Sequence, residues 1–301
     1  MDRFQALRIF VAVGEEQSFA AAARRLATSA PSVTRAVAAL EETLGVKLLQ
    51  RTTRIVRLTE AGARYLLDCK RVLSDLEDAD QAVSGERQGE LRGTLAITAS
   101  VMFGRLFVAP LLLGFLNRHP KLNGRAVLVD RVVDLIEEGL DVAVRIARLP
   151  DSSFTAVRVG AVRNVVCASP AYLKRHGVPR TPSELKDHAA ICFSPDRSPP
   201  AWTFEGGKQA LSVRPSARLV VNSAEVALQG AVAGEGVTRV LSYQAASELQ
   251  AGRLRVILRE FEPVPIPIHV IHREGKHGAA RVRAFVDFAV AELRRNPLLK
   301  A

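Results

Sequence analysis

Residues 18–49 read SFAAAARRLATSAPSVTRAVAALEETLGVKLL, and this stretch decides how the N-terminal part of the chain folds. Ser18 can cap a short helix from Phe19 to Leu26, in which a run of alanines permits close packing. After a turn over residues 27–29, Ser29 is the candidate N-cap of another helix. Pro31 follows in its first turn, where the missing N–H costs nothing. The stretch therefore predicts two helices joined by a tight turn.

The helix that starts after Ser29 has two different faces. Its apolar residues recur at a 4-3-4 spacing, so they face the core: Val33, Val37, Leu40 and Leu44. The opposite face carries Pro31, Arg35, Ala38 and Glu42, flanked by Ser32 and Thr34, so its start is small, polar and cationic. Glu41 and Glu42 near the C-terminal end would be repelled by phosphates. If this helix enters a major groove, it must therefore enter with its N-terminus first. Gly45 ends the helix.

Two further segments complete a small N-terminal module. The spacing of apolar residues from Ala6 to Val13 predicts a first helix that buries one face. Residues 46–58 predict a hairpin with basic and hydroxyl residues at its turn, which suits a wing that contacts phosphates or the minor groove. The candidate DNA-contacting residues of the module are Ser18, Thr28, Ser29, Pro31, Ser32, Thr34, Arg35, Arg51, Thr53 and Arg54. Taken one at a time, each is more simply a solvated surface residue, so the prediction rests on the joint pattern.

That joint pattern, from Ser18 to Leu49 and on through QRTTRIVRLTEAG at residues 50–62, resembles the winged helix-turn-helix of LysR-type transcriptional regulators. About forty residues match without a gap. The resemblance implies a sequence-specific DNA-binding protein. Two positions depart from the family pattern, which usually has Phe where this chain has Leu49 and often has Gln at Ala30. Loss of the glutamine could alter the reading of base edges, whereas the fold expectation is unaffected.

A long polar segment over residues 59–88, free of proline, predicts one helix with an apolar seam. The seam is close to a heptad pattern over about three repeats, and its members are Leu58, Ala61, Tyr65, Cys69, Val72, Leu76, Ala79 and Val83. The family resemblance implies a dimerisation helix here, and the alternative is a helix packed on its own domain. Pairing two such helices would present two recognition helices to the half-sites of an inverted repeat in double-stranded DNA. The sequence does not decide between a dimer and a tetramer.

From Leu91 onward, β-like runs alternate with helical patterns, which predicts an α/β domain. The runs are residues 95–97, 126–129, 142–144, 165–167, 219–221 and 268–271. This part resembles the LysR effector domain, which has the two-lobed fold of periplasmic solute-binding proteins. The segments that carry the resemblance are residues 91–95, 130–136, 139–146 and 252–254. The fold class is thus a multidomain α+β and α/β chain.

The predicted boundaries are a DNA-binding domain over 1–58, a linker helix over 59–89 and an effector domain over 90–301. Lobe I would comprise about 90–163 and 268–301, and lobe II about 164–267. The lobes should exchange strands near 162–165 and 265–268, and the second crossing contains the stiff segment PVPIP at 263–267.

A small effector is expected between the lobes, and it is expected to be anionic. Two helix N-termini, one after residues 94–99 and one after 219–221, have free N–H groups that favour a carboxylate or phosphate. The candidate effector-binding residues are Ser100, Val101, Met102, Arg145, Phe193, Ser194, Asn222 and Ser223. For the helix ends the plain alternative is capping, with Asn222 and Glu225 as a capping box. For Arg145 the alternative is a salt bridge at a strand end.

Charge and composition agree with an anionic partner but do not locate it. Lys and Arg number 42 against 31 Asp and Glu, a net charge of +11. Residues 1–58 hold nine basic and five acidic residues, whereas residues 91–301 hold 29 and 18. The excess therefore lies mostly outside the predicted DNA-binding module. Many exposed arginines would produce the same excess without an acidic effector.

Other functional classes have weaker support. No nucleotide-binding glycine loop, hydrolase elbow or zinc-protease motif occurs, so neither an enzyme nor a bound cofactor is predicted. The spacings of the three cysteines and six histidines predict no disulfide framework or metal site. The apolar run near residue 110 is interrupted, and the N-terminus shows no signal peptide, so a cytoplasmic protein with no membrane partner is expected. A solute-binding protein is the main rival, but it leaves residues 1–58 unexplained.

Overall fold

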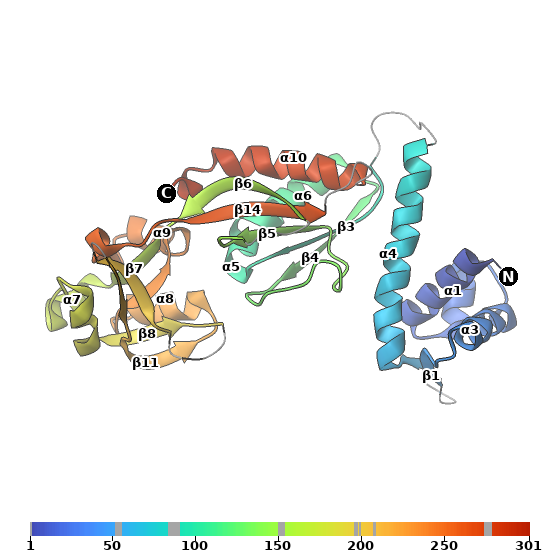
Figure 1. Cartoon of the computed structure of the whole chain (residues 1–301), viewed down its shortest axis with the longest axis horizontal. Helices are drawn as coiled ribbons and strands as arrows, with labels where there is room; N and C mark the ends of the chain where they lie inside the picture. The colour runs from blue at the N-terminus through green and yellow to red at the C-terminus, as the bar shows by residue number, and fades with distance from the viewer. Residues whose placement is uncertain are drawn as a thin grey trace. The chain divides into compact units, whose positions relative to one another are not determined.

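The structure is a computed structural model that describes residues 2–51, 56–83, 91–149, 154–195, 198, 200–206, 209–273 and 279–301. The chain divides into two compact units, both drawn in Figure 1. The first comprises Met1–Gly93 with the segments Asp134–Leu140 and Lys276–Ala280. The second comprises Thr94–Val133, Asp141–Gly275 and Arg281–Ala301.

The first unit is a winged helix-turn-helix followed by a long helix. Its elements are α1 (Arg3–Glu16), α2 (Phe19–Arg25), α3 (Ala30–Leu44), β1 (Leu49–Arg51), β2 (Val56–Leu58) and α4 (Glu60–Val83). The wing strands pair antiparallel, with Leu49 opposite Leu58. Phe10 and Val13 of α1 pack with Val33 and Val37 of α3 in one apolar core. The predicted core face of α3 is confirmed.

Local capping chemistry sets the ends of the short helices. The hydroxyl of Ser18 accepts a hydrogen bond from the N–H of Ala21, and the hydroxyl of Ser29 accepts one from the N–H of Ser32. Gly45 ends α3 with φ +65°, a left-handed conformation that favours glycine. These three predicted caps are confirmed. The helix that begins at Phe19 ends at Arg25, one residue earlier than expected.

The second unit contains two lobes. The sheet of lobe I has the strand order β4-β3-β5-β14-β6, with β3 parallel to β5 and β14 antiparallel to both β5 and β6. Its elements are β3 (Gly93–Ala99), α5 (Val101–Phe103), η1 (Gly104–Val108), α6 (Ala109–Arg118), β4 (Leu122–Leu128), β5 (Val142–Ile146), β6 (Phe154–Val162), β14 (Ile266–Arg273), α10 (Ala280–Arg295) and η4 (Pro297–Leu299). In Figure 1, α10 lies along this sheet.

Lobe II is built from smaller sheets. Strands β12, β7 and β13 form one sheet, β8 and β11 pair in parallel, and β9 and β10 form a hairpin. Its elements are β7 (Asn164–Ala168), α7 (Pro170–His176), η2 (Pro182–Asp187), β8 (Ala189–Phe193), β9 (Trp202–Gly206), β10 (Gln209–Val213), β11 (Ser216–Val221), α8 (Ala224–Val232), β12 (Thr238–Leu241), α9 (Ser242–Gln250), β13 (Arg255–Ile257) and η3 (Arg259–Phe261). All six runs predicted as strands from the sequence lie in strands or overlap them.

Two segments connect the lobes, and an ion pair joins them. Arg163 lies between β6 and β7, and Glu262 lies between η3 and β14. The Arg163 guanidinium donates to the Glu262 carboxylate at 2.7 Å. The backbone of Arg163 also exchanges hydrogen bonds with Ser242, since its N–H donates to the Ser242 hydroxyl and its carbonyl accepts from the Ser242 N–H. These contacts tie the two connections to the start of α9.

The helical segment Val101–Arg118 is long and apolar enough, by length and composition alone, to cross a membrane. The expectation that the interruptions of this apolar run exclude a membrane span is therefore wrong as an argument from length and composition. One side of this segment packs into the domain, with Phe103, Val108 and Phe115 buried. The ring of Phe115 meets that of Phe285 on α10 edge to face, at 5.3 Å between centroids. Such packing is typical of a core helix.

Candidate functional site

The outer face of α3 is free of the domain core. Ser29, Pro31 and Arg35 are exposed, and Ser32 and Thr34 are partly exposed. Because the apolar side of the helix is buried, this face is the side that α3 turns to solvent. Among the described residues, Arg35 has no hydrogen-bond or ion-pair partner. The structure thus places five of the predicted contact residues on one helical surface that begins at the N-terminal end.

The other residues predicted to contact DNA come before or after α3 in the sequence. Ser18 is partly exposed and caps α2, and Thr28 is exposed in the turn before α3. Arg51 is the last residue of β1, and the structure describes its backbone only. Thr53 and Arg54 lie outside the described residues.

The acidic end of α3 differs from the sequence interpretation. Glu42 is exposed, but Glu41 is only 3% exposed and its carboxylate points inward. Oε2 of Glu41 accepts a hydrogen bond from Lys47 Nζ at 2.8 Å, and Oε1 accepts from the N–H groups of Leu48 and Leu49. Burial raises the pKa of Glu41, but these donors outweigh it, so the pKa lies below its ordinary value. Glu41 is therefore an internal anion and does not face DNA.

Helix α4 packs on its own domain along one side. Leu66 and Cys69 are buried and Leu73 is partly buried, all in the core that α1 and α3 share. Gly14 of α1 makes this approach possible, because a side chain there would lie 3.1 Å from Leu66. The expected dimer seam is thus wrong at Cys69, which lies in the domain core. The alternative of a helix packed on its own domain applies to this side.

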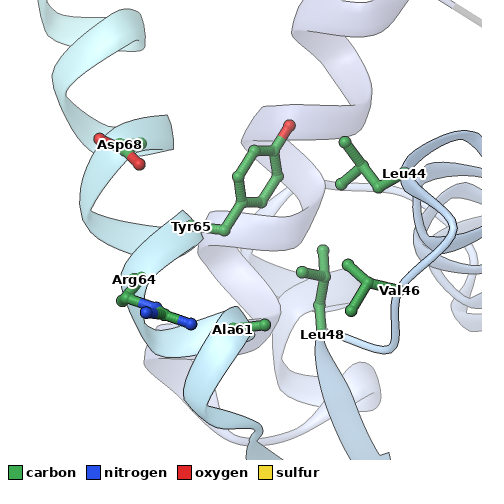
Figure 2. Close-up of a pocket in the computed structure, with 7 residues that line it drawn as sticks. All are labelled: Leu44, Val46, Leu48, Ala61, Arg64, Tyr65 and Asp68. Atoms are coloured by element: carbon green, nitrogen blue, oxygen red, sulfur yellow. The ribbon is translucent and has the colours of Figure 1, made fainter.

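A second side of α4 borders an open groove of about 360 Å³ whose lining is both apolar and polar, shown in Figure 2. In this view the ring of Tyr65 points from α4 toward the segment that connects α3 to β1. The groove is lined by Leu44, Val46, Leu48, Ala61, Arg64, Tyr65 and Asp68. Seam residues Ala61 and Tyr65 therefore face this groove. Of these seam residues, Cys69 thus lies in the domain core, whereas Ala61 and Tyr65 border an open surface.

In lobe I, four of the predicted effector-binding residues lie at the carboxyl ends of the parallel strands β3 and β5. Ser100, Val101 and Met102 follow β3 directly, and Arg145 lies near the end of β5. The Arg145 guanidinium donates to the hydroxyl of Thr98 at 3.0 Å. Thr98 belongs to β3, so the cation is held against the strand that leads to Ser100.

The first turn of α5 is already occupied by groups of the chain. Asp130 Oδ1 accepts a hydrogen bond from the N–H of Val101 at 3.1 Å, a contact that the sequence interpretation missed. The hydroxyl of Ser100 does not cap the helix; it hydrogen-bonds the hydroxyl of Tyr243 from lobe II. Burial raises the pKa of Tyr243 well above its ordinary value, and the nearby Asp130 carboxylate adds to this shift.

In lobe II, the other four predicted residues also lie together. Phe193 at the end of β8 is opposite Val221 at the end of β11, and the N–H of Ser194 donates to the carbonyl of Val221. Ser194 is buried. The predicted capping box at Asn222 is wrong by one residue, because Ser223 is the N-cap and accepts from the N–H of Val226.

The two groups of predicted effector residues are joined across the lobes. Glu225, in the first turn of α8, forms an ion pair with Arg105 of η1. Met102 packs against the apolar cluster of lobe II around Leu228. Phe103 meets the ring of Tyr243 edge to face, at 5.3 Å between centroids. Both helix N-termini proposed for an anion therefore already have a carboxylate nearby.

The charged residues of the segment from Gly234 to Arg239 have structural partners. Glu235 forms an ion pair with Arg218 at 2.9 Å. The Arg239 guanidinium donates to the carbonyl of Thr203 and lies over the ring of Phe204. Burial lowers the pKa of Arg239 to about 10. All of these partners lie within lobe II.

Within the described parts of the chain, no group of His, Cys, Asp and Glu is arranged to hold a metal ion. The three cysteines are free and buried. Burial raises the pKa of Cys69 to about 11 and that of Cys167 to about 12, so these thiols stay protonated and are poor nucleophiles. His269 and His272 lie on β14, and neither belongs to a cluster of metal-ligating residues.

A helix-turn-helix with an exposed recognition face, joined to a two-lobed α/β domain, defines the class of ligand-responsive DNA-binding proteins. Residues 4–63 match the model of the bacterial regulatory helix-turn-helix protein, LysR family, and residues 88–294 match the LysR substrate-binding domain. The chain belongs to the LysR family of transcriptional regulators. Members of this family bind DNA and small effectors and are oligomeric, and the chain is a regulator and not an enzyme.

Relatives match over nearly the whole chain. An HTH-type transcriptional regulator of Xanthomonas campestris is 37% identical, covering 95% of this chain and 84% of the relative. The HTH-type transcriptional activator AaeR of Escherichia coli is 34% identical, covering 95% and 93%. The solved structure of CrgA, a LysR-type regulator from Neisseria meningitidis, is 31% identical with a TM-score of 0.61, covering 96% of this chain and 98% of that one. These matches agree with the predicted fold class.

Proposed function

We propose that this regulator reads double-stranded DNA through the exposed face of α3, and that a small effector bound between its two lobes controls the reading. The observation that carries the first part is the division of α3 into a buried face and an exposed polar face. Its contact residues are Ser18, Thr28, Ser29, Pro31, Ser32, Thr34 and Arg35, with Arg51, Thr53 and Arg54 from the wing. The protein is expected to act in the cytoplasm, where its DNA target lies.

The recognition face combines two kinds of contact. Ser29 and Ser32 share a hydrogen bond at the helix start, where N–H groups and the helix dipole attract a phosphate. Arg35 lies one turn further along and has the length and donors to pair with a guanine edge. Phosphate contacts fix the orientation, and base contacts supply the sequence preference. Ala30 is exposed and offers no hydrogen bond where the family often has glutamine.

The operator is proposed to be an inverted repeat bound by a dimer that pairs through α4. The groove beside Tyr65 leaves apolar surface of the wing and of α4 uncovered. A two-fold dimer presents the same surface of both copies, and two recognition helices then fit half-sites about one helical turn apart. Helix α4 has more acidic than basic residues, which agrees with a position outside the DNA because phosphates would repel it.

The effector is proposed to be a small anion that contacts the residues at the strand ends: Ser100, Val101, Met102, Arg145, Phe193, Ser194, Asn222 and Ser223. The net positive charge of residues 91–301 and the Arg145 guanidinium support this class. An anion at the first turn of α5 must exchange places with the Asp130 carboxylate. The effector changes DNA binding only if its affinity differs between two arrangements of the protein.

DNase I footprinting of the full-length protein on the intergenic regions flanking its own gene tests this proposal. Protection of two half-sites in successive major grooves is the expected result. Titrating carboxylates into the footprint should change the protected pattern. A variant with Ser100→Trp should keep the basal footprint and lose that change. If none of the flanking fragments is protected in low-salt buffer, the operator proposal is overturned. If Ser100→Trp still responds to carboxylates, the proposed effector site is overturned.

A further inference from the structure

Glu41 is a buried charge at a junction of three elements. Its side chain leaves the last turns of α3 and accepts three hydrogen bonds, from Lys47 Nζ at 2.8 Å, Leu48 N at 3.0 Å and Leu49 N at 3.1 Å. Both backbone donors belong to the segment that enters strand β1 of the wing. The carboxylate thus accepts from two consecutive backbone N–H groups of this segment.

The same short segment is held from its other side by the start of α4. The hydroxyl of Thr59 donates to the carbonyl of Lys47 at 2.8 Å and accepts from the N–H of Gly62 at 2.9 Å. The N–H of Thr59 donates to the carbonyl of Leu48 at 2.9 Å. Residues 47–49 are therefore fixed between the recognition helix and the linker helix, with Glu41 as the contact from α3.

An ionised carboxylate at a site 3% exposed is costly unless donors surround it. Here the donors compensate, and the lowered pKa keeps Glu41 charged at neutral pH. An apolar side chain of similar size would fill the space but leave the N–H groups of Leu48 and Leu49 without their acceptor. Residue 41 therefore has to supply an acceptor oxygen where Oε1 lies. A negative charge placed elsewhere would not satisfy the two N–H groups.

We propose that Glu41 is a positioning residue for DNA binding: through Oε1 it sets the direction of β1, and so of the wing, relative to the recognition face of α3. The inference rests on the proposed contact of the wing with DNA. Arg51 lies two residues beyond Leu49 on the same strand, so a change in the direction of β1 moves its backbone. Recognition helix and wing then reach DNA as one rigid unit.

Three variants of the full-length protein test the role of Oε1. Glu41→Gln retains a side-chain oxygen that can accept from Leu48 and Leu49 and removes the charge. Glu41→Asp retains the charge on a side chain one methylene shorter. Glu42→Ala is the matched control, since it removes the neighbouring exposed carboxylate. Hydroxyl-radical footprinting separates protection at the flanks of each half-site, assigned to the wing, from protection at its centre, assigned to α3.

Glu41→Gln and Glu42→Ala should keep flanking protection and bind within about threefold of the parent protein. Glu41→Asp should lose flanking protection, keep central protection and bind at least tenfold more weakly. Its plot of log affinity against log salt should also be shallower, because phosphate contacts are lost. Amide hydrogen exchange at Leu48 and Leu49 should accelerate in Glu41→Asp only.

Loss of flanking protection in folded Glu41→Gln, or its retention in Glu41→Asp, overturns the role of Oε1. If the parent protein shows no flanking protection, the proposed wing contact with DNA fails instead. In that case, the proposal that Oε1 fixes the segment entering β1 is still supported if amide exchange at Leu48 and Leu49 is slow in Glu41→Gln and fast in Glu41→Asp. Equal exchange in the two variants overturns that part as well.

Discussion

Asp130 accepts a hydrogen bond from the backbone N–H of Val101 at 3.1 Å, so a carboxylate of the chain already lies at the first turn of α5. A helix N-terminus attracts one anion strongly, and a second anion nearby is repelled by the first. An effector carboxylate aimed at this turn therefore competes with Asp130. A carboxylate of lobe I thus already occupies the position proposed for the carboxylate of the effector.

Asp130→Asn should increase the affinity for carboxylates. The amide oxygen can still accept from Val101, whereas the negative charge is gone. We expect binding of benzoate or succinate to strengthen on the order of tenfold, which corresponds to about 1.4 kcal/mol. The shift of the melting temperature with ligand concentration measures this effect. Weaker binding in the variant would show that Asp130 contacts the ligand directly.

Arg35→Ala should weaken operator binding by about 1–3 kcal/mol if the guanidinium reads a base edge. Arg35 is exposed on α3, and its removal leaves the buried face of the helix intact. Gel-shift titration at fixed salt measures the loss. Arg255→Ala is the matched control, because it removes an exposed arginine from the effector domain. Equal affinities of the two variants would contradict a base contact by Arg35.

Local chemistry made much of the N-terminal fold predictable. Ser18, Ser29 and Gly45 act on groups within a few residues, so the sequence alone indicates the helix ends. The apolar spacing of α3 likewise indicates which face is buried. The six predicted strands follow from short β-branched runs between turn residues. These features are decided by neighbours along the chain, which is why pattern and structure agree.

The parts that the sequence did not predict depend on partners distant along the chain. Asp130 and Val101 are 29 residues apart, and Glu41 reaches donors seven and eight residues away around a turn. No periodicity points to such pairs. Cys69 matches the heptad spacing of a dimer seam, yet the approach of α1 buries it in the domain. Spacing indicates that a side is apolar, but tertiary packing decides what covers it.

The N-terminal unit should lose stability in acid partly through Glu15. This carboxylate on α1 pairs with Lys70 of α4 and Arg25 of α2, each at 2.6 Å. Burial raises its pKa, but the two cations outweigh burial and the pKa lies below its ordinary value near 4.5. A depressed carboxyl pKa contributes stability above its unfolded value, and this contribution disappears as the pH falls through the folded value.

Glu15→Gln should therefore lower the stability of the protein at pH 7 by less than about 1 kcal/mol, because all three side chains are partly exposed. As the pH falls from neutral through the folded pKa of Glu15, the variant and the parent should become equally stable. Thermal melts monitored by circular dichroism over this pH range measure the difference. A stability difference between the two proteins that does not shrink as the pH is lowered would contradict the assignment to this ion-pair cluster.

Gly62→Ala should destabilise the protein by more than about 2 kcal/mol, because the new Cβ would lie 1.9 Å from the carbonyl oxygen of Leu48. The clash would push the start of α4 away from β1. Gly114→Ala in α6 is the matched control, since nothing lies within 4 Å of its Cβ. That change should be neutral or stabilise by up to about 1 kcal/mol, as expected for alanine in a helix interior. Chemical denaturation of both variants measures the contrast.

Val72→Glu should disrupt the dimer if α4 pairs through the side that borders the groove. At 100° per residue, Val72 shares the side of Ala61 and Tyr65, whereas Leu67 points about 140° away. Both side chains are 39% exposed, so neither charge enters the domain core. Leu67→Glu is therefore the matched control. Analytical ultracentrifugation should find Val72→Glu shifted toward monomer and Leu67→Glu unchanged. A dimer of unchanged stability in Val72→Glu would place the interface on another surface.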